Sequence, residues 1–159
     1  MGFLTNKKAL VLGIASKKSI AYGIAKALKE QGASVAITFQ NERLKERAEN
    51  FGAELSSPFV VKCDVDDDSD IKYLFENVDR NWREVDIIVH SIAFAPREML
   101  QGNYLDNLTR EGFRIAHETS SYSFAAIGKA AIPYLSKNSA LLTLSYIGAI
   151  RAMPSYNIM

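Results

Sequence analysis

The sequence has a single cysteine, almost no net charge and no long apolar run, and each of these shortages excludes a class of protein. The lone Cys63 cannot form a disulfide within the chain, which favours a reducing, cytoplasmic setting. Because 19 Lys and Arg face 18 Asp and Glu, the formal net charge is +1, and nothing points to a nucleic-acid partner. No apolar run approaches membrane-spanning length, and residues 1–8 lack the apolar stretch of a secretory signal.

The hydrophobic residues, 48% of the chain, form short runs that alternate with helix-like patterns. This rhythm is typical of β-α units around a parallel sheet, and the length suits one domain. Strands are expected at residues 8–12, 34–39, 58–63, 85–90 and 140–145, and helices at about 20–31, 42–55, 68–82 and 110–133. We therefore predict an α/β fold, a Rossmann-type doubly wound parallel sheet, with an irregular segment at 94–109.

The residues that follow each expected strand are the first candidates for function. In a doubly wound sheet the second and third strands extend one side of the first, and the fourth lies on the other side. Ligands bind at the carboxyl ends of the strands, where the order switches. Those positions hold Gly13, Gln40, Asp64, segment 91–95 and Tyr146.

The turn after the first strand is suited to a phosphate group. Gly13 allows close backbone approach, and the helix that follows offers free N–H groups at its N-terminus. Ser16 and Ser19 add hydroxyl groups. The G-x-G-x-x-G spacing is absent, so a tight turn with a serine cap remains the alternative interpretation.

The ends of the second and third strands suit an adenosine group. Gln40 can accept a hydrogen bond from a ribose hydroxyl but carries no charge for a 2′-phosphate, which favours NADH over NADPH. Asp64 could accept from an adenine amino group. We interpret the acidic run at 66–68 as a helix start, and we expect no metal site.

Tyr146 and Tyr156 lie near the end of the sequence, close to the expected crevice. Pro154 suits the opening of a new helix near Ser155. A phenol, with an ordinary pKa of about 10, stays protonated and can donate to an oxygen that gains negative charge. Each tyrosine could also be a core or rim residue.

The remaining reactive side chains are interpreted as structural. We expect His90 and His117 to be packed, hydrogen-bonded residues rather than bases. Cys63 lies at a strand end and is expected to be buried and inert.

Several separated motifs together resemble one known family. Residues 19–25, 90–96, 109–117, 142–146 and 153–157 are similar to the bacterial NADH-dependent enoyl-[acyl-carrier-protein] reductases of type II fatty acid synthesis. These enzymes are a divergent group of the short-chain dehydrogenase/reductase superfamily. The resemblance extends from Met1 to Met159, and it implies reduction of the trans-2 double bond of an enoyl thioester by NADH.

The resemblance also implies roles for particular residues. Cofactor-binding positions would be Gly13, Ser19, Ile20, Gln40, Asp64, Val65 and Ile92. Ala95 would contact substrate through its backbone. Tyr156 would hydrogen-bond the thioester carbonyl and Tyr146 would support the site. The segment at 94–109 would form part of an acyl pocket, and the helix from Arg110 would pack between subunits of a homotetramer.

The resemblance further implies that the NAD-binding domain at 1–159 is incomplete. The lysine that follows the second tyrosine in this family would lie beyond Met159, as would later strands and helices. We therefore expect the segment alone to be inactive. A ketoreductase of the same superfamily is an alternative, although Thr143 stands where that group has a serine. A non-catalytic dinucleotide-binding module is a second alternative.

Overall fold

The computed structural model describes residues 2–153 and 156–158. Within that part of the chain, parallel strands form a 5-stranded sheet in the order β3-β2-β1-β4-β5. The strands are β1 (Lys8–Leu12), β2 (Ser34–Phe39), β3 (Val60–Lys62), β4 (Val85–His90) and β5 (Leu135–Thr143). The doubly wound order is confirmed: β2 and β3 extend the sheet on one side of β1, and β4 and β5 extend it on the other. The strand order therefore switches between β1 and β4, where a ligand crevice is expected.

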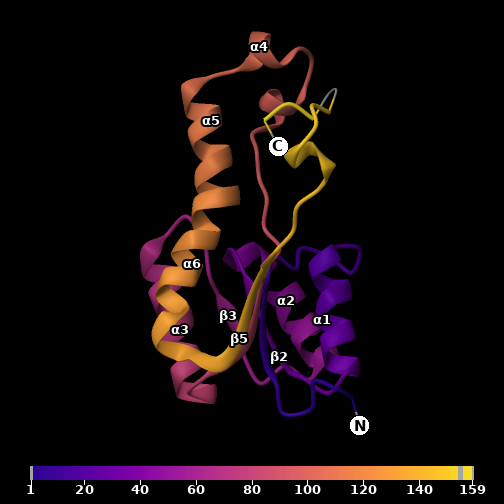
Figure 1. Cartoon of the computed structure of the whole chain (residues 1–159), viewed down its shortest axis with the longest axis vertical. Coiled ribbons are helices and arrows are strands. Elements are labelled where there is room, and N and C mark those ends of the chain that lie inside the picture. Colours follow the sequence, from indigo (N-terminus) through magenta and orange to yellow (C-terminus); the bar gives the residue numbers. More distant parts are fainter. Residues whose placement is uncertain (1, 154–155, 159) are drawn as a thin grey trace.

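Helices cover both faces of the sheet, as Figure 1 shows. They are α1 (Ile20–Glu30) and α2 (Glu42–Leu55) on one face, and α3 (Asp68–Trp82) and α6 (Ser123–Ala131) on the other. Side chains alternate along β1, so Ala9 and Val11 pack towards α1 and α2, while Leu10 and Leu12 pack towards α3 and α6. All four side chains are 0% exposed. Because this strand is buried on both faces, its sequence is continuously apolar from Ala9 to Leu12.

Local signals set the helix boundaries. The Ser19 hydroxyl accepts a hydrogen bond from the Tyr22 N–H at 3.3 Å and caps α1, which is followed by Gly32 at φ +94°. Asp67 caps α3 by accepting from the Ser69 N–H at 2.8 Å. The acidic run is therefore a helix start, as the sequence predicted.

The expected helix at 110–133 is interrupted. It consists of α5 (Arg110–His117), a π-helical turn (Glu118–Tyr122), α6, and a final 3-10 turn (Ile132–Tyr134) that contains Pro133. Proline has no N–H and cannot continue the helix.

Two strand boundaries also differ from the prediction. β5 begins at Leu135 rather than Ala140, because Leu135 already pairs with Val85; the polar residues at 136–139 lie in an irregularity before Ala140 pairs with Ile87. β3 is limited to Val60–Lys62, although the Cys63 N–H still donates to the Phe39 carbonyl at 2.8 Å.

A projecting part stands beyond the carboxyl edge of the sheet (Figure 1). It comprises a 3-10 turn (Arg97–Leu100), the short α4 (Tyr104–Asn107), α5 and the chain after β5. Met99, 1% exposed, packs against Gly112 of α5, where an added Cβ would fall 2.5 Å from the methionine sulfur. Among the described residues no helix has both the length and the apolar character needed to cross a bilayer.

Candidate active site

Gly13 brings the loops after β1 and β4 into close contact. Its φ is +95°, a conformation that L side chains rarely adopt. An added Cβ would fall 2.7 Å from the Ser91 carbonyl carbon, closer still to its oxygen, and 3.1 Å from Ile92 Cγ1. The Ser91 N–H donates to the Leu12 carbonyl at 3.2 Å. Glycine is therefore required where the sheet order switches.

The outer side of the glycine loop is held by α2. Lys17 Nζ lies 2.6 Å from a Glu54 carboxylate oxygen, and Tyr22 donates to the other oxygen at 2.7 Å. Arg47 donates to the Ala15 carbonyl at 3.2 Å. These contacts fix the shape of the loop that precedes α1.

A hollow of about 310 Å³ lies over the carboxyl ends of β1, β2 and β3, and we call it the β3-side hollow. Five of the predicted cofactor-binding residues line it: Gly13, Gln40, Asp64, Val65 and Ile92. Gln40 Nε2 lies 3.5 Å from each Asp64 carboxylate oxygen, so the amide and the carboxylate share one rim. The positions inferred for adenosine are thus brought together.

A larger hollow of about 730 Å³ opens on the other side of the Gly13–Ile92 contact, and we call it the tyrosine-side hollow. Ser19 and Ile20 line it, together with Tyr146 and Tyr156. Gly13 and Ile92 belong to the walls of both hollows. A ligand long enough to fill both would pass over the start of α1.

The two tyrosine rings meet edge to face, with centroids 5.1 Å apart and planes at 64°. Tyr146 is 42% exposed and Tyr156 48%, so both phenols are accessible from the hollow. Gly148 makes room for the Tyr146 ring, because an added Cβ would fall 2.6 Å from its Cε2 atom. The prediction that both phenols gather at the crevice is consistent with this placement.

Three other predicted features lie apart from the two hollows or outside the described residues. Ala95 is 9% exposed and lines neither hollow as the described residues define them. Ser16 acts locally, accepting from the Lys18 N–H at 3.2 Å. The helix expected to open at Pro154 and Ser155 falls on residues outside the described part of the chain.

The two histidines have different environments. His90 is 0% exposed and lies 2.7 Å from the Ser123 hydroxyl, as expected of a packed residue, and burial lowers the pKa of its imidazole. His117 is exposed, so the expectation of a packed residue is wrong. Its ring stacks on Phe113 at 4.2 Å and borders the tyrosine-side hollow.

Cys63 has the properties of an inert thiol. It is 3% exposed, and burial, with nearby carboxylates, raises the pKa of its thiol to about 12. The thiolate is therefore scarce at neutral pH.

The acidic residues near β3 are engaged with protein groups. Asp70 pairs with Lys62 at 2.9 Å and accepts from the Asp64 N–H at 3.0 Å. Within the described ranges, no group of three or more His, Cys, Asp and Glu side chains converges as metal ligands would.

Sequence reasoning missed Thr119 and Ser120. Thr119 lines the β3-side hollow and Ser120 the tyrosine-side hollow, and both belong to the π-helical turn. The sequence predicted an uninterrupted helix here, and the resemblance placed that helix between subunits of a homotetramer. Two adjacent hydroxyl residues on a helix close to an irregular segment were the signal that could have identified these positions.

These features define a class of protein. An open parallel sheet, a glycine turn leading into a helix, and hollows on both sides of the switch point are the features of a Rossmann-type domain. Residues 13–159 match the family model described as enoyl-(acyl carrier protein) reductase. The chain therefore belongs to the enoyl-(acyl carrier protein) reductase family.

Individual relatives agree with this assignment. The chain is 54% identical over 159 residues to the enoyl-[acyl-carrier-protein] reductase [NADH] of Escherichia coli and 53% identical to that of Haemophilus influenzae. Each match covers 100% of the chain and 61% of the relative, so the chain spans about three fifths of their length.

Solved structures show the same fold. The Aquifex aeolicus enoyl-[acyl-carrier-protein] reductase (NADH) superposes with a TM-score of 0.96 at 44% identity, over 99% of this chain and 62% of that one. The Anaplasma phagocytophilum enoyl-(acyl-carrier-protein) reductase, solved in complex with NAD, gives 0.95 at 36% identity, over 99% and 61%.

Proposed function

We propose that this chain supplies the NADH site and the acid tyrosines of an enzyme that reduces the trans-2 double bond of enoyl-acyl-carrier-protein thioesters. The observation that carries the proposal is the wall at Gly13 and Ile92 that the two hollows share. Side chains suited to adenosine line the hollow on one side of it, and the two phenols line the hollow on the other. The NADH-specific names of the relatives and the NAD complex of one neighbour support it.

The residues present suit an extended dinucleotide. Gly13 lines both hollows, and the loop that follows it leads to the N-terminus of α1, where free N–H groups favour a pyrophosphate. Ser19 and Ile20 border the same path, and Ile92 would contact the nicotinamide half. Gln40, Asp64 and Val65 would hold the adenosine half, and the neutral Gln40 favours NADH over NADPH.

The tyrosines suit an oxygen that gains charge. When bound, NADH supplies the hydride that is added to the β-carbon of the thioester. The Tyr156 hydroxyl would donate a hydrogen bond to the thioester carbonyl oxygen as that oxygen becomes an enolate, and the α-carbon would then be protonated. Tyr146, held edge to face against Tyr156, would limit the positions open to that phenol.

Steady-state kinetics, measured on the full-length protein that the gene encodes, test this function. We expect NADH oxidation with a crotonyl thioester, and a loss of about 10²–10³ in kcat for Tyr156→Phe, as for other removed oxyanion donors. Tyr73→Phe removes a hydroxyl from the outer face of α3, where Tyr73 is 48% exposed, and should leave kcat unchanged.

The same assay separates the alternatives. Faster reduction of an acetoacetyl thioester than of a crotonyl thioester would indicate a ketoreductase. NADH binding without turnover of either thioester would indicate a non-catalytic binding module.

We also propose an acyl-carrier-protein-linked substrate, a homotetramer and a cytoplasmic location. The α5 region exposes large side chains, with Phe113 43% and Tyr122 60% exposed, which supports packing against another subunit. Light scattering after size exclusion should give a tetramer mass, and a monomer would contradict the assembly. Ala95 remains a proposed substrate contact, tested by chemical-shift changes at its amide when a thioester is added.

A further inference from the structure

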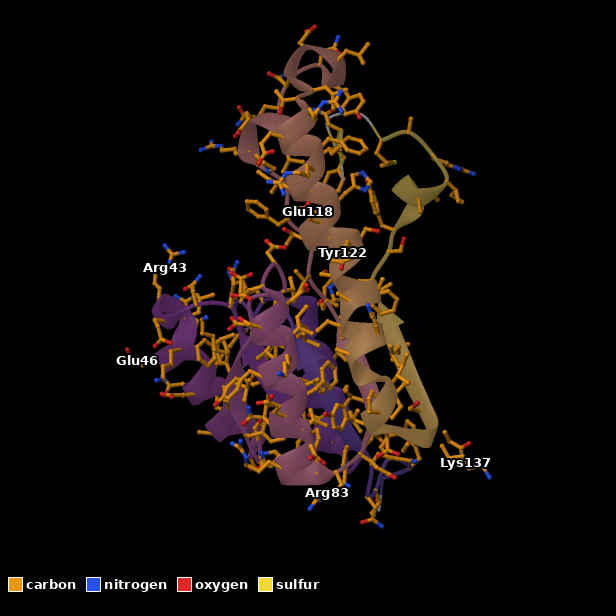
Figure 2. The ribbon with its side chains drawn as sticks, turned by 90° about the vertical axis from the view of Figure 1, so that its left-hand side faces the viewer. Arg43, Glu46, Arg83, Glu118, Tyr122 and Lys137 are labelled. Atoms are coloured by element: carbon orange, nitrogen blue, oxygen red, sulfur yellow. The ribbon has the colours of Figure 1, made fainter. Side chains whose placement is uncertain are left out.

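Hydroxyl side chains in and beside the π-helical turn contact the loops that form the two hollows. Figure 2 marks the turn by Glu118 and Tyr122, where the projecting part meets the sheet and its helices. The Thr119 hydroxyl donates to the Asp66 carboxylate at 2.8 Å. The Ser120 hydroxyl accepts from the Phe94 N–H at 2.9 Å and donates to the Phe94 carbonyl at 3.0 Å.

The Ser120 contact holds the loop after β4. Both backbone polar groups of Phe94 are engaged by one side chain, while the Phe94 ring is 52% exposed and provides little packing. Phe94 lines the β3-side hollow, and the preceding Ala93 lines both hollows. The Ser120 hydroxyl is therefore an anchor for the backbone beside Ile92.

The Thr119 contact holds the loop after β3. Thr119 is 5% exposed, whereas Asp66 is exposed and lies two residues beyond Asp64. Thr119, Asp66 and Val65 all border the β3-side hollow. By holding the Asp66 carboxylate, Thr119 holds the part of the hollow's wall that the loop after β3 forms.

A buried link secures the turn to the sheet. The Ser123 hydroxyl lies 2.6 Å from the Thr119 carbonyl and 2.7 Å from His90 Nε2. A hydroxyl has one proton; if Ser123 donates it to the carbonyl, the imidazole must donate from Nε2, which assigns this tautomer to His90. His90 is 0% exposed and burial lowers the pKa of its ring, so the link persists with a neutral imidazole at neutral pH.

The helix geometry explains why one turn reaches two loops. Successive residues of a helix point in different directions, so the neighbouring Thr119 and Ser120 contact different loops, and the Ser123 hydroxyl reaches the Thr119 carbonyl one turn before it. π-Helical turns are rare and often occur at functional sites.

We propose that the π-helical turn positions the dinucleotide cleft, with Thr119 setting the loop after β3 and Ser120 the loop after β4. Both are positioning residues, and the inference rests on the proposed NADH site. Loss of either hydroxyl lets its loop move, which weakens cofactor binding although neither group need touch the cofactor.

NADH titration of the protein as its gene encodes it tests the inference, with fluorescence as the signal and circular dichroism confirming that each variant is folded. Thr119→Val and Ser120→Ala should each raise the Kd for NADH by about tenfold, the scale of one or two lost hydrogen bonds. Thr119→Ser and Ser120→Thr keep the hydroxyls and should stay within about threefold of the parent.

Further measurements separate positioning from a general loss of stability. Tyr122→Phe removes a hydroxyl from the same turn, outside the two hollows, and should leave the Kd unchanged. Amide exchange at Phe94 should accelerate in Ser120→Ala and not in Tyr122→Phe. Ser120→Cys replaces Ser120→Ala if the alanine variant does not fold, and should also weaken binding.

The possible failures are distinguishable. An unchanged Kd in Thr119→Val and Ser120→Ala, with a parent that binds NADH, overturns the inference alone. The inference is also overturned if Thr119→Ser and Ser120→Thr bind NADH as weakly as Thr119→Val and Ser120→Ala. A parent that does not bind NADH overturns the proposed function, and the inference with it.

Discussion

Substituting Gly13 by alanine is the most direct perturbation of the crevice. At φ +95° a non-glycine residue costs about 1–2 kcal/mol through backbone strain alone. The added methyl group would also overlap the Ser91 carbonyl group, which is backbone and cannot rotate away as a side chain could. The Ser91–Ile92 loop would have to move, and that loop lines both hollows.

We expect Gly13→Ala to lower the free energy of unfolding by about 2 kcal/mol or more, and to raise the Kd for NADH at least about tenfold. Urea unfolding followed by circular dichroism measures the first effect, and fluorescence titration the second. The affinity loss follows from displacement of the loop rather than from loss of a contact.

Gly23→Ala is the matched control. Gly23 lies in the interior of α1, is exposed, and has nothing within 4 Å of an added Cβ. Alanine there should raise the free energy of unfolding by about 0.5–1 kcal/mol without changing the Kd. A Gly13→Ala protein that matched the parent in stability and affinity would refute the reasoning.

Further substitutions probe the rest of the molecule. Asp86, whose side chain is 12% exposed, accepts from Lys7 and two further donors, so Asp86→Ala should destabilise by about 2 kcal/mol at neutral pH. Burial opposes ionisation of the Asp86 carboxyl, but the three donors outweigh it and lower the pKa of this group. Its contribution to stability is therefore full above the unfolded-state pKa of about 4, and it is lost as the pH falls through the lower folded-state pKa. Urea unfolding curves of the parent and Asp86→Ala should accordingly converge in acid. Iodoacetamide should label Cys63 far more slowly in folded than in urea-unfolded protein, and equal rates would contradict the raised thiol pKa. Gly148→Ala should lower kcat by displacing the Tyr146 ring, and an unchanged kcat would show that the ring does not depend on this glycine.

The sheet and much of the crevice could be predicted because strong local signals agree with the fold. Runs such as 9–12 and 87–89 are apolar on both faces, as a central parallel strand requires. Gly13 and Gln40 follow such strands, so the topology alone brings them to one edge. That reasoning needs only strand order, which is why these positions were accessible from sequence.

The π-helical turn and the start of β5 could not be predicted for physical reasons. Periodicity analysis assumes a constant repeat, so an inserted residue within 118–122 leaves no signal in the apolar pattern. Residues 136–139 are polar strand residues on the sheet edge, where no buried face imposes alternation. Ala95 is 9% exposed and lies in an irregular segment, where no periodic pattern indicates which residues are buried.

A crystal structure of the protein with bound NADH would test the central claim most directly. Our account predicts the adenine in the β3-side hollow beside Gln40 and Val65, the pyrophosphate over Gly13, and the nicotinamide in the tyrosine-side hollow near Ile92 and Tyr156. A dinucleotide bound elsewhere, or bound in reverse with adenine beside the tyrosines, would contradict it.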